Sequence, residues 1–216
     1  MKKISIMVFS ILLLSICGIK VNAQDDTKAK TILDGVSATM KAYTSMKIEF
    51  TYTMVNTKTN VNESKSGVIQ IKGSKYHLEI GGQTVFCDGS TVWTYLKDEN
   101  EVNINNVSSQ EDAINPTTIL SNYTSNFKPK WIKDVVEGGK TIAVIDMTPI
   151  KGKSYYKVRL NIDKTAKQIK STIVYDKNGS TYTYKVNNFT ANLAMAEAIF
   201  TFNKASYPGV EENDMR

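Results

Sequence analysis

The feature that most constrains this chain is a recurring alternation of apolar and polar residues. This period of two is typical of a β-strand that buries one face and exposes the other. It is clearest from Met46 to Met54, where apolar residues stand at every second position and Lys47, Glu49, Thr51 and Thr53 lie between them. The same alternation returns at 69–71, 76–80, 156–162, 169–175 and 182–186.

Residue pairs that favour tight turns stand between these segments. Asp88-Gly89, Gly138-Gly139 and Asn178-Gly179 all tolerate the positive φ that short hairpins need. Strands in hairpin order predict one antiparallel sheet, curled into a barrel-like shell. We interpret the Asp88-Gly89 turn as a structural feature of that sheet.

One predicted helix precedes the strands and a second is inserted among them, so the predicted class is mainly β with α. Apolar residues share one helical face from Asp26 to Tyr43, and Asp25 or Asp26 can cap the start of this helix. A second, short helix is expected after Asn115-Pro116, with Ile119, Leu120, Tyr123 and Phe127 at helical spacing. Both helices are expected to plug the concave side of the sheet. The candidate lining of the apolar cavity between them is Leu33, Val36, Met40, Phe50, Tyr52, Leu78, Trp93, Ile119, Leu120, Tyr123 and Leu160.

The first residues have the pattern of a secretory signal peptide. Lys2 and Lys3 precede an apolar run from Ile4 to Ile16, and Val21-Asn22-Ala23 resembles a cleavage site. We expect a signal peptide at 1–23 and a single domain at 24–216. Lipid attachment at Cys17 is a weaker alternative, because the residue before the acylated Cys should be small and Ile16 is not.

The sequence is poor in catalytic chemistry. His77 is the only His, and Cys87 is the only Cys after the leader. This inventory does not predict a metal site, and no nucleophile elbow, phosphate-binding loop or dinucleotide fingerprint occurs. The net charge of +6 comes from scattered Lys residues, which does not favour nucleic-acid binding. We therefore expect a protein that is not an enzyme and has no cofactor.

Four stretches resemble the outer-membrane lipoprotein carrier family, LolA. The first runs from Cys87 to Tyr95 and reads C-D-G-S-T-V-W-T-Y. The others are Gly67 to Leu78, the Asn115-Pro116 pair, and the chain end, where Phe200-Thr201-Phe202 is followed by Tyr207-Pro208-Gly209-Val210 and Asp214-Met215-Arg216. Their order agrees with that of the family, so the resemblance covers nearly the whole expected mature chain.

The resemblance implies an unclosed β-barrel of about eleven strands with a helical lid over an apolar cavity. It also implies a periplasmic carrier, expected to be monomeric, which takes acylated lipoproteins from an inner-membrane exporter to an outer-membrane acceptor. A family arginine that latches the lid is replaced here by Lys72 or Gly73, depending on a one-residue gap. Lys lacks the planar fork of arginine and Gly has no side chain to donate, so we expect the lid to open more readily.

Three alternatives remain from the sequence. The first is a domain of the same fold that binds or senses a hydrophobic ligand without transporting it. The second is an outer-membrane β-barrel, which is disfavoured by the terminal Arg216 and by the two helices. The third is a periplasmic enzyme without a recognisable motif.

Overall fold

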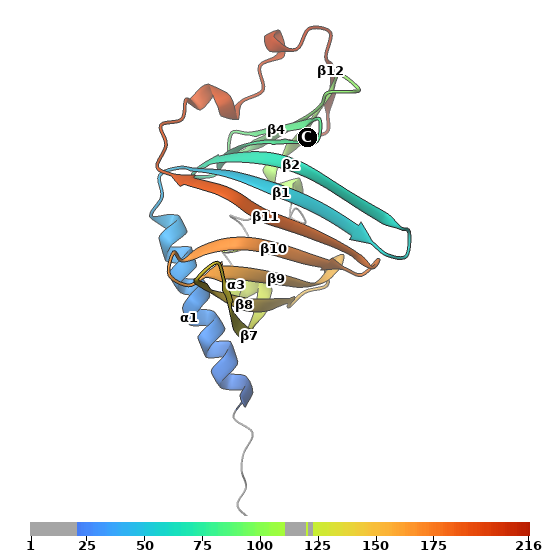
Figure 1. Ribbon diagram of the computed structural model, residues 1–216. Coiled ribbons are helices and arrows are strands. Elements are labelled where there is room, and N and C mark those ends of the chain that lie inside the picture. Colours follow the sequence, from blue (N-terminus) through green and yellow to red (C-terminus); the bar gives the residue numbers. More distant parts are fainter. Residues whose placement is uncertain (1–20, 111–119, 121–122) are drawn as a thin grey trace, which may run out of the picture.

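The computed structural model describes residues 21–110, 120 and 123–216, and these form one curled sheet with helices at its margins (Figure 1). Within this part of the chain twelve strands join in the order β12-β6-β5-β4-β3-β2-β1-β11-β10-β9-β8-β7. The strands are β1 (Met46–Asn56), β2 (Val61–Lys72), β3 (Lys75–Ile80), β4 (Gln83–Cys87), β5 (Thr91–Leu96), β6 (Glu101–Asn106), β7 (Phe127–Glu137), β8 (Lys140–Pro149), β9 (Tyr155–Asp163), β10 (Gln168–Asp176), β11 (Ser180–Ala191) and β12 (Glu211–Asp214).

The sheet is unclosed, because β7 and β12 lie at its opposite edges. This confirms the predicted mainly β, barrel-like class. Within the described residues the sheet has twelve strands, against the count of about eleven that the resemblance implied. One of them, β12, pairs with β6 in parallel, whereas all other neighbours are antiparallel. No alternation in the sequence marks β12 as a strand, because Glu211–Asp214 is wholly polar.

The central strand β1 shows how the alternation becomes structure. Met46, Ile48 and Phe50 are buried, while Lys47 and Glu49 are more exposed and form an ion pair of 3.3 Å on the other face. β1 pairs along its whole length with β2 on one side and with β11 on the other. The backbone of β1 is therefore hydrogen-bonded on both sides. Its apolar face lies in the middle of the concave side of the sheet.

The first helix, α1 (Val21–Lys41), covers one part of that concave side. It is already helical at Val21, the first described residue, so Asp25 and Asp26 lie inside it and do not cap it as predicted. Leu33 and Val36 have no exposed surface, and they pack with residues of β7 to β10 in the largest hydrophobic cluster. Asp134 of β7 accepts hydrogen bonds from Lys28 of α1 at 3.4 Å and from Lys164 at 2.9 Å.

The second predicted helix is described only in part. Asn115-Pro116, where it was expected to begin, lies outside the described residues, and its visible end is α3 (Tyr123–Asn126). The prediction was wrong for Phe127, which is the first residue of β7. Its backbone pairs with Pro149 of β8 and its ring stacks on Tyr155 at 6.4 Å, so tertiary packing overrides the helical spacing.

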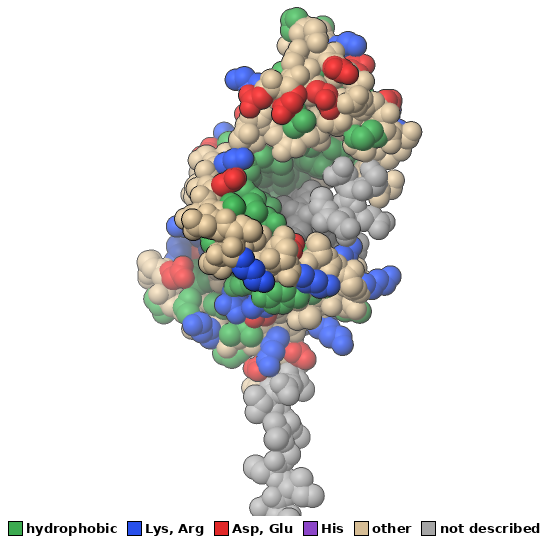
Figure 2. All heavy atoms as spheres, turned by 90° about the vertical axis from the view of Figure 1, so that its right-hand side faces the viewer, with side chains coloured by type: hydrophobic (Ala, Val, Ile, Leu, Met, Phe, Trp, Pro, Cys, Tyr) green, Lys and Arg blue, Asp and Glu red, His purple; other side chains and the backbone are tan. Residues whose placement is uncertain are grey.

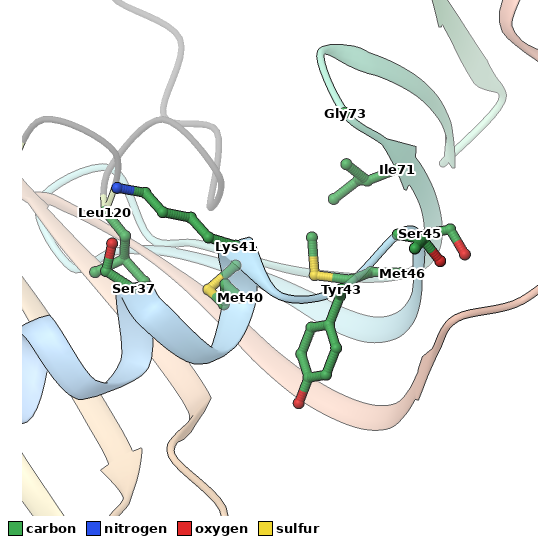
Figure 3. A pocket seen from close by; sticks show the side chains of 10 residues that line it. Ser37, Met40, Lys41, Tyr43, Ser45, Met46, Ile71, Gly73 and Leu120 are labelled. Atoms are coloured by element: carbon green, nitrogen blue, oxygen red, sulfur yellow. The ribbon is translucent and has the colours of Figure 1, made fainter.

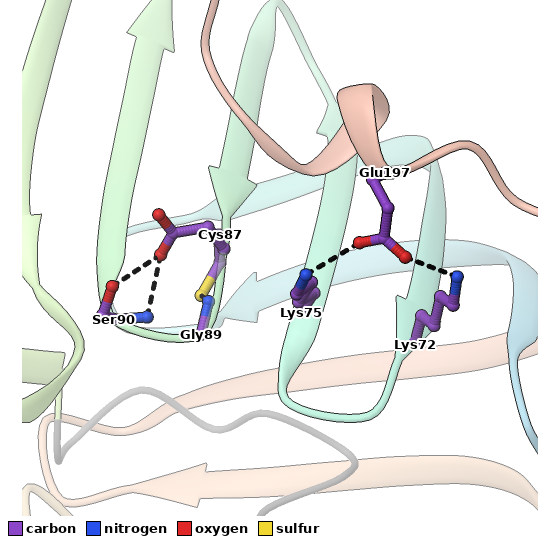
Figure 4. A network of polar contacts seen from close by, with 7 residues as sticks. Lys72, Lys75, Cys87, Gly89, Ser90 and Glu197 are labelled. Atoms are coloured by element: carbon purple, nitrogen blue, oxygen red, sulfur yellow. Dashed lines mark hydrogen bonds and ion pairs between the residues drawn. The ribbon is translucent and has the colours of Figure 1, made fainter.

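The C-terminal segment returns across the outer face of the sheet. It contains the short helices η2 (Glu197–Phe200) and η3 (Lys204–Ser206) and then forms β12; a further short helix, η1 (Val107–Gln110), follows β6. Glu197 bonds Lys72 at 2.5 Å and Lys75 at 2.7 Å, above the hairpin of β2 and β3 (Figure 4). Further on, the segment buries one apolar cluster against β4 to β6, made of Phe86, Trp93, Tyr95, Val102, Phe202, Tyr207 and Val210.

The turn between β4 and β5 depends on Gly89. Asp88 accepts hydrogen bonds from the backbone N–H groups of Ser90 and Thr91, both at 2.8 Å, and Gly89 has a φ of +100°. A Cβ at Gly89 would lie 2.6 Å from Oγ of Ser74. Position 89 therefore favours glycine for two reasons: its φ is positive, and the side chain of Ser74, as it lies, leaves no room for a Cβ atom.

Gly89→Ala is expected to lower the free energy of unfolding by about 1–3 kcal/mol through strain at positive φ. Gly152→Ala is the matched control, because Gly152 has no positive φ and no atom lies within 4 Å of the added Cβ; it should stay within about 0.5 kcal/mol. Urea denaturation of both variants measures the difference. Equal stability of the two variants would contradict the structural role of this turn.

Candidate functional site

An apolar hollow, which we call the main cavity, lies on the concave face of the sheet beside the end of α1. Its volume is about 300 Å³. Every described residue in its lining is uncharged, and Figure 2 shows hydrophobic side chains gathered in a hollow in the middle of the molecule. The lining consists of Met40, Tyr43, Ile48, Phe50, Ile69, Tyr76, Leu78, Gln83, Val85, Thr94, Gln168, Ile169, Thr172, Tyr184, Val186 and Phe189.

Strand register creates this lining around Phe50. Phe50 lies opposite Gly67 on β2 and Val186 on β11. A Cβ at Gly67 would come within 2.5 Å of the Phe50 ring, so only glycine leaves room for the ring over that strand. The ring therefore lies low on the sheet, and Phe50 forms part of the floor of the main cavity.

A smaller pocket adjoins the main cavity where α1 ends and β1 begins (Figure 3). Its volume is about 290 Å³. Met40 and Tyr43 line both hollows, so these two side chains stand between them. The remaining lining of the smaller pocket is Ser37, Lys41, Thr44, Ser45, Met46, Ile71, Gly73 and Leu120.

Two phenol groups of the main cavity, those of Tyr76 and Tyr184, are neutral at physiological pH. Burial raises the pKa of both Tyr76 and Tyr184 to about 12. Tyr184 packs on Tyr52 with a ring distance of 5.3 Å, and Tyr52 in turn stacks on Tyr182 at 6.4 Å. These phenols supply hydrogen-bonding groups to an apolar surface without adding charge.

Among the predicted cavity residues, Met40, Phe50 and Leu78 line the main cavity. Tyr52 packs beside it on Tyr184, and Leu120 lines the smaller pocket.

Four other predicted residues lie in packed core and line neither hollow. Leu33, Val36 and Leu160 have no exposed surface, and Tyr123 is buried with them. The hydroxyl of Tyr123 donates to Asp34 of α1 at 2.5 Å, which ties α3 to α1. The reason for the difference is that α1 packs directly onto β7 to β10, and only its last turn reaches the open part of the concave face. Ile119 lies outside the described residues.

The structure corrects the position of Trp93, which lies on the outer face. Trp93 pairs with Phe86 on β4 and packs under the C-terminal segment, while the next residue, Thr94, lines the main cavity. Both faces of β5 are covered, since Val92 is also buried, on the concave side. A strand with two covered faces gives no alternation from which the inner face can be recognised.

Lys72 and Gly73, the two candidates for the position of the family arginine, lie on different faces of the sheet. Lys72 bonds Glu197 on the outer face, whereas Gly73, with a φ of +59°, lines the smaller pocket. The carboxylate of Glu197 also binds Lys75, and these bonds lower its pKa to about 2. In this structure Lys72 therefore holds the C-terminal segment.

Sequence reasoning missed several lining residues, including Ile48, Ile69, Val85, Tyr184 and Val186. The alternation did place Tyr184 and Val186 on one face of a strand. It could not show that β11 pairs with β1, because that pairing joins residues far apart in the chain. The order of strands was the missing information.

Other kinds of site find no support in the described part of the chain. Residues 21–110, 120 and 123–216 contain no group of three or more His, Cys, Asp or Glu that could hold a metal ion. No helix in these ranges combines the length and apolar character that crossing a membrane requires. His77 packs on Phe86 at 4.9 Å, and burial lowers its pKa.

A curled, unclosed sheet with an apolar cavity on its concave face is the architecture of the LolA-like fold. The chain belongs to the family of the outer membrane lipoprotein carrier protein LolA, whose model matches residues 41–203. No curated protein matches the sequence.

The chain is similar to several solved structures at low sequence identity. A conserved protein of Thermus thermophilus is 12% identical with a TM-score of 0.60, over 87% of this chain and 99% of that one. A lipoprotein-sorting protein domain of Vibrio parahaemolyticus is 12% identical with a TM-score of 0.48, over 84% and 99%. The lipoprotein LppX of Mycobacterium tuberculosis is 11% identical with a TM-score of 0.49, over 79% and 98%. The Thermus structure supports the fold alone.

The raised pKa values of Tyr76 and Tyr184 predict a loss of stability at alkaline pH. A group whose pKa is higher in the folded than in the unfolded state stabilises the fold fully below its unfolded pKa, here about 10, and ceases to do so as the pH rises through its folded pKa. The free energy of unfolding should therefore fall between pH 10 and about 12.

Urea denaturation across this range tests the prediction with the variant Tyr184→Phe, in which the fall should be shallower. Tyr156→Phe is the control, because Tyr156 is half exposed and does not line the main cavity. A pH profile of Tyr184→Phe identical to that of the unchanged protein would rule out this contribution.

Proposed function

We propose that this protein is a periplasmic carrier that holds the acyl chains of lipoproteins in the main cavity and transfers them from the inner to the outer membrane. The observation that carries the proposal is an uncharged apolar cavity on the concave face of a LolA-family sheet. The partners would be acylated lipoproteins, an inner-membrane exporter and an outer-membrane acceptor.

The energetics of acyl chains explain why such a carrier is needed. Each methylene group that is removed from water contributes about 0.8 kcal/mol to the free energy of burial. The acyl chains of a lipoprotein contain many such groups, so they do not leave a membrane unaided. The carrier must also release them, which disfavours a tightly fitted site. Met40 suits this compromise, because its flexible thioether side chain can repack around a variable chain.

The size of the main cavity favours a second candidate function. A volume of about 300 Å³ lies at the lower end of the range for small-molecule sites. It would suit a domain that binds or senses one hydrophobic ligand and does not carry lipoproteins. Both candidate functions require binding of a hydrophobic ligand, but only the carrier transfers lipoproteins between membranes.

Filling the main cavity should abolish acyl-chain binding. Val186 and Lys185 are neighbours on β11, with Val186 in the cavity lining and Lys185 exposed on the other face. Val186→Trp should weaken binding of a synthetic triacylated lipopeptide at least tenfold, whereas Lys185→Trp should leave it unchanged. Native mass spectrometry and fluorescence titration measure the complex.

A spheroplast assay then tests transport. The unchanged protein should release newly made lipoproteins from spheroplasts into a soluble complex, and Val186→Trp should not. Tight binding of the lipopeptide without any release would support the binding or sensing function instead.

We also propose that residues 1–23 are removed on export, so that the mature chain begins at Gln24 and carries no lipid. The support is the charged start, the short apolar run and the small residues before Gln24. The intact mass of protein from the periplasm should equal that of residues 24–216. A mass increased by diacylglycerol, with Cys17 as the first residue, would contradict this proposal.

A further inference from the structure

We propose that the main cavity and the smaller pocket form one binding site for a single-chain amphiphile with an anionic head group. The chain would occupy the main cavity, and the head group would bind Lys41 in the smaller pocket. This inference rests on the proposed function only in that the main cavity takes an acyl chain.

The two hollows are separated by a thin and partly movable boundary. Met40 and Tyr43 line both of them. Tyr43 is fixed by its ring contact with Phe189 at 5.5 Å, whereas Met40 has three rotatable bonds and no polar partner to break. Rotation of the Met40 side chain would therefore connect the two hollows.

The volumes suit one chain better than three. The hollows measure about 300 and 290 Å³, and sites for compact small molecules range from about 300 to 1,000 Å³. A connected site of this size would take one acyl chain with its head group. The three chains of a triacylated lipoprotein would need the sheet and α1 to separate further.

Charge is distributed unevenly over the joined site. Lys41 is the one charged side chain among the described lining residues of the two hollows. It follows Ser37 by one helical turn on α1, so both side chains lie on the same face of the helix, and Figure 3 shows both at the smaller pocket with Leu120. An ammonium group and a hydroxyl at one end of an apolar hollow are complementary to a carboxylate or a phosphate.

The neighbouring lysines, other than Lys41, are already bound to a carboxylate and do not bind the head group. Lys72 and Lys75 both bind Glu197 on the outer face (Figure 4), whereas Lys41 has no ion pair with any described residue. Lys41 also stands in the last turn of α1, where the helix end carries about half a negative charge. The full charge of its ammonium group exceeds this, so the end of the pocket remains attractive to an anion.

The test compares ligands that share a chain and differ in the head group. Delipidated mature protein is titrated at pH 8 with palmitate, palmitoyl lysophosphatidate and 1-hexadecanol, by displacement of a fluorescent fatty acid. Lys41→Gln should weaken binding of the two anions roughly two- to fivefold, which lies in the upper part of the range for a solvent-accessible ion pair. Hexadecanol binding should not change, and Lys41→Arg should retain the preference for anions.

Lys97→Gln is the matched control, because Lys97 is exposed and lies outside both hollows. The relative affinities of palmitate and palmitoyl lysophosphatidate show whether the natural head group is a carboxylate or a phosphate. High salt should reduce the preference for the anions over hexadecanol in the unchanged protein and have little effect in Lys41→Gln.

The outcomes separate this inference from the proposed function. If all three ligands bind and Lys41→Gln leaves their ratio unchanged, the head-group site is wrong, while an acyl-binding cavity stands. If only a triacylated lipopeptide binds, the single-chain ligand is wrong and the carrier stands. If no ligand with an acyl chain binds, the proposed function fails as well.

Discussion

An apolar sheet face must be buried, and α1 covers only part of the concave face of this sheet. Leu33 and Val36 of α1 pack on β7 to β10 without exposed surface, whereas Ile169 and Thr172 of β10 already border the main cavity. Where α1 ends at Lys41, the chain turns into β1, and the described helices α1 and α3 do not continue over the apolar face of β1 to β4 that lines the main cavity. The main cavity therefore begins where α1 ends on the sheet.

Polar contacts position the two covering segments rather than supply most of the stability. Asp134 joins α1 to β7 through Lys28, and Glu197 joins the C-terminal segment to β2 and β3 through Lys72 and Lys75. Exposed ion pairs of this kind contribute only about 0–1 kcal/mol each. The burial of Phe200, which has no exposed surface, and of the aromatic cluster around Phe86 contributes more to holding the C-terminal segment.

The division of the concave face also gives Met40 a special position. Met40 packs against both the cluster under α1 and the cluster on β1 and β2, and it lines both hollows. A side chain at the junction of rigid core and open cavity can move without unfolding either neighbour. Such a movement of Met40 is therefore compatible with a sheet that stays intact.

The sequence by itself determined the alternating strands, the tight turns and the apolar stripe of α1, because these depend on neighbouring residues. Alternation from Met46 to Met54 and the Asp88-Gly89 pair specify local geometry that the structure contains. Tertiary structure alone decided which face of a strand borders the main cavity when both of its faces are covered. Trp93 lies under the C-terminal segment and Thr94 lines the main cavity, although both belong to β5. In addition, β12 is a strand only because β6 pairs with it.

Leu33 and Leu78 are both apolar residues on faces that point inward. Leu33 is completely packed, whereas Leu78 borders the main cavity. That outcome depends on where α1 ends over the sheet, which is set by contacts between residues far apart in the chain.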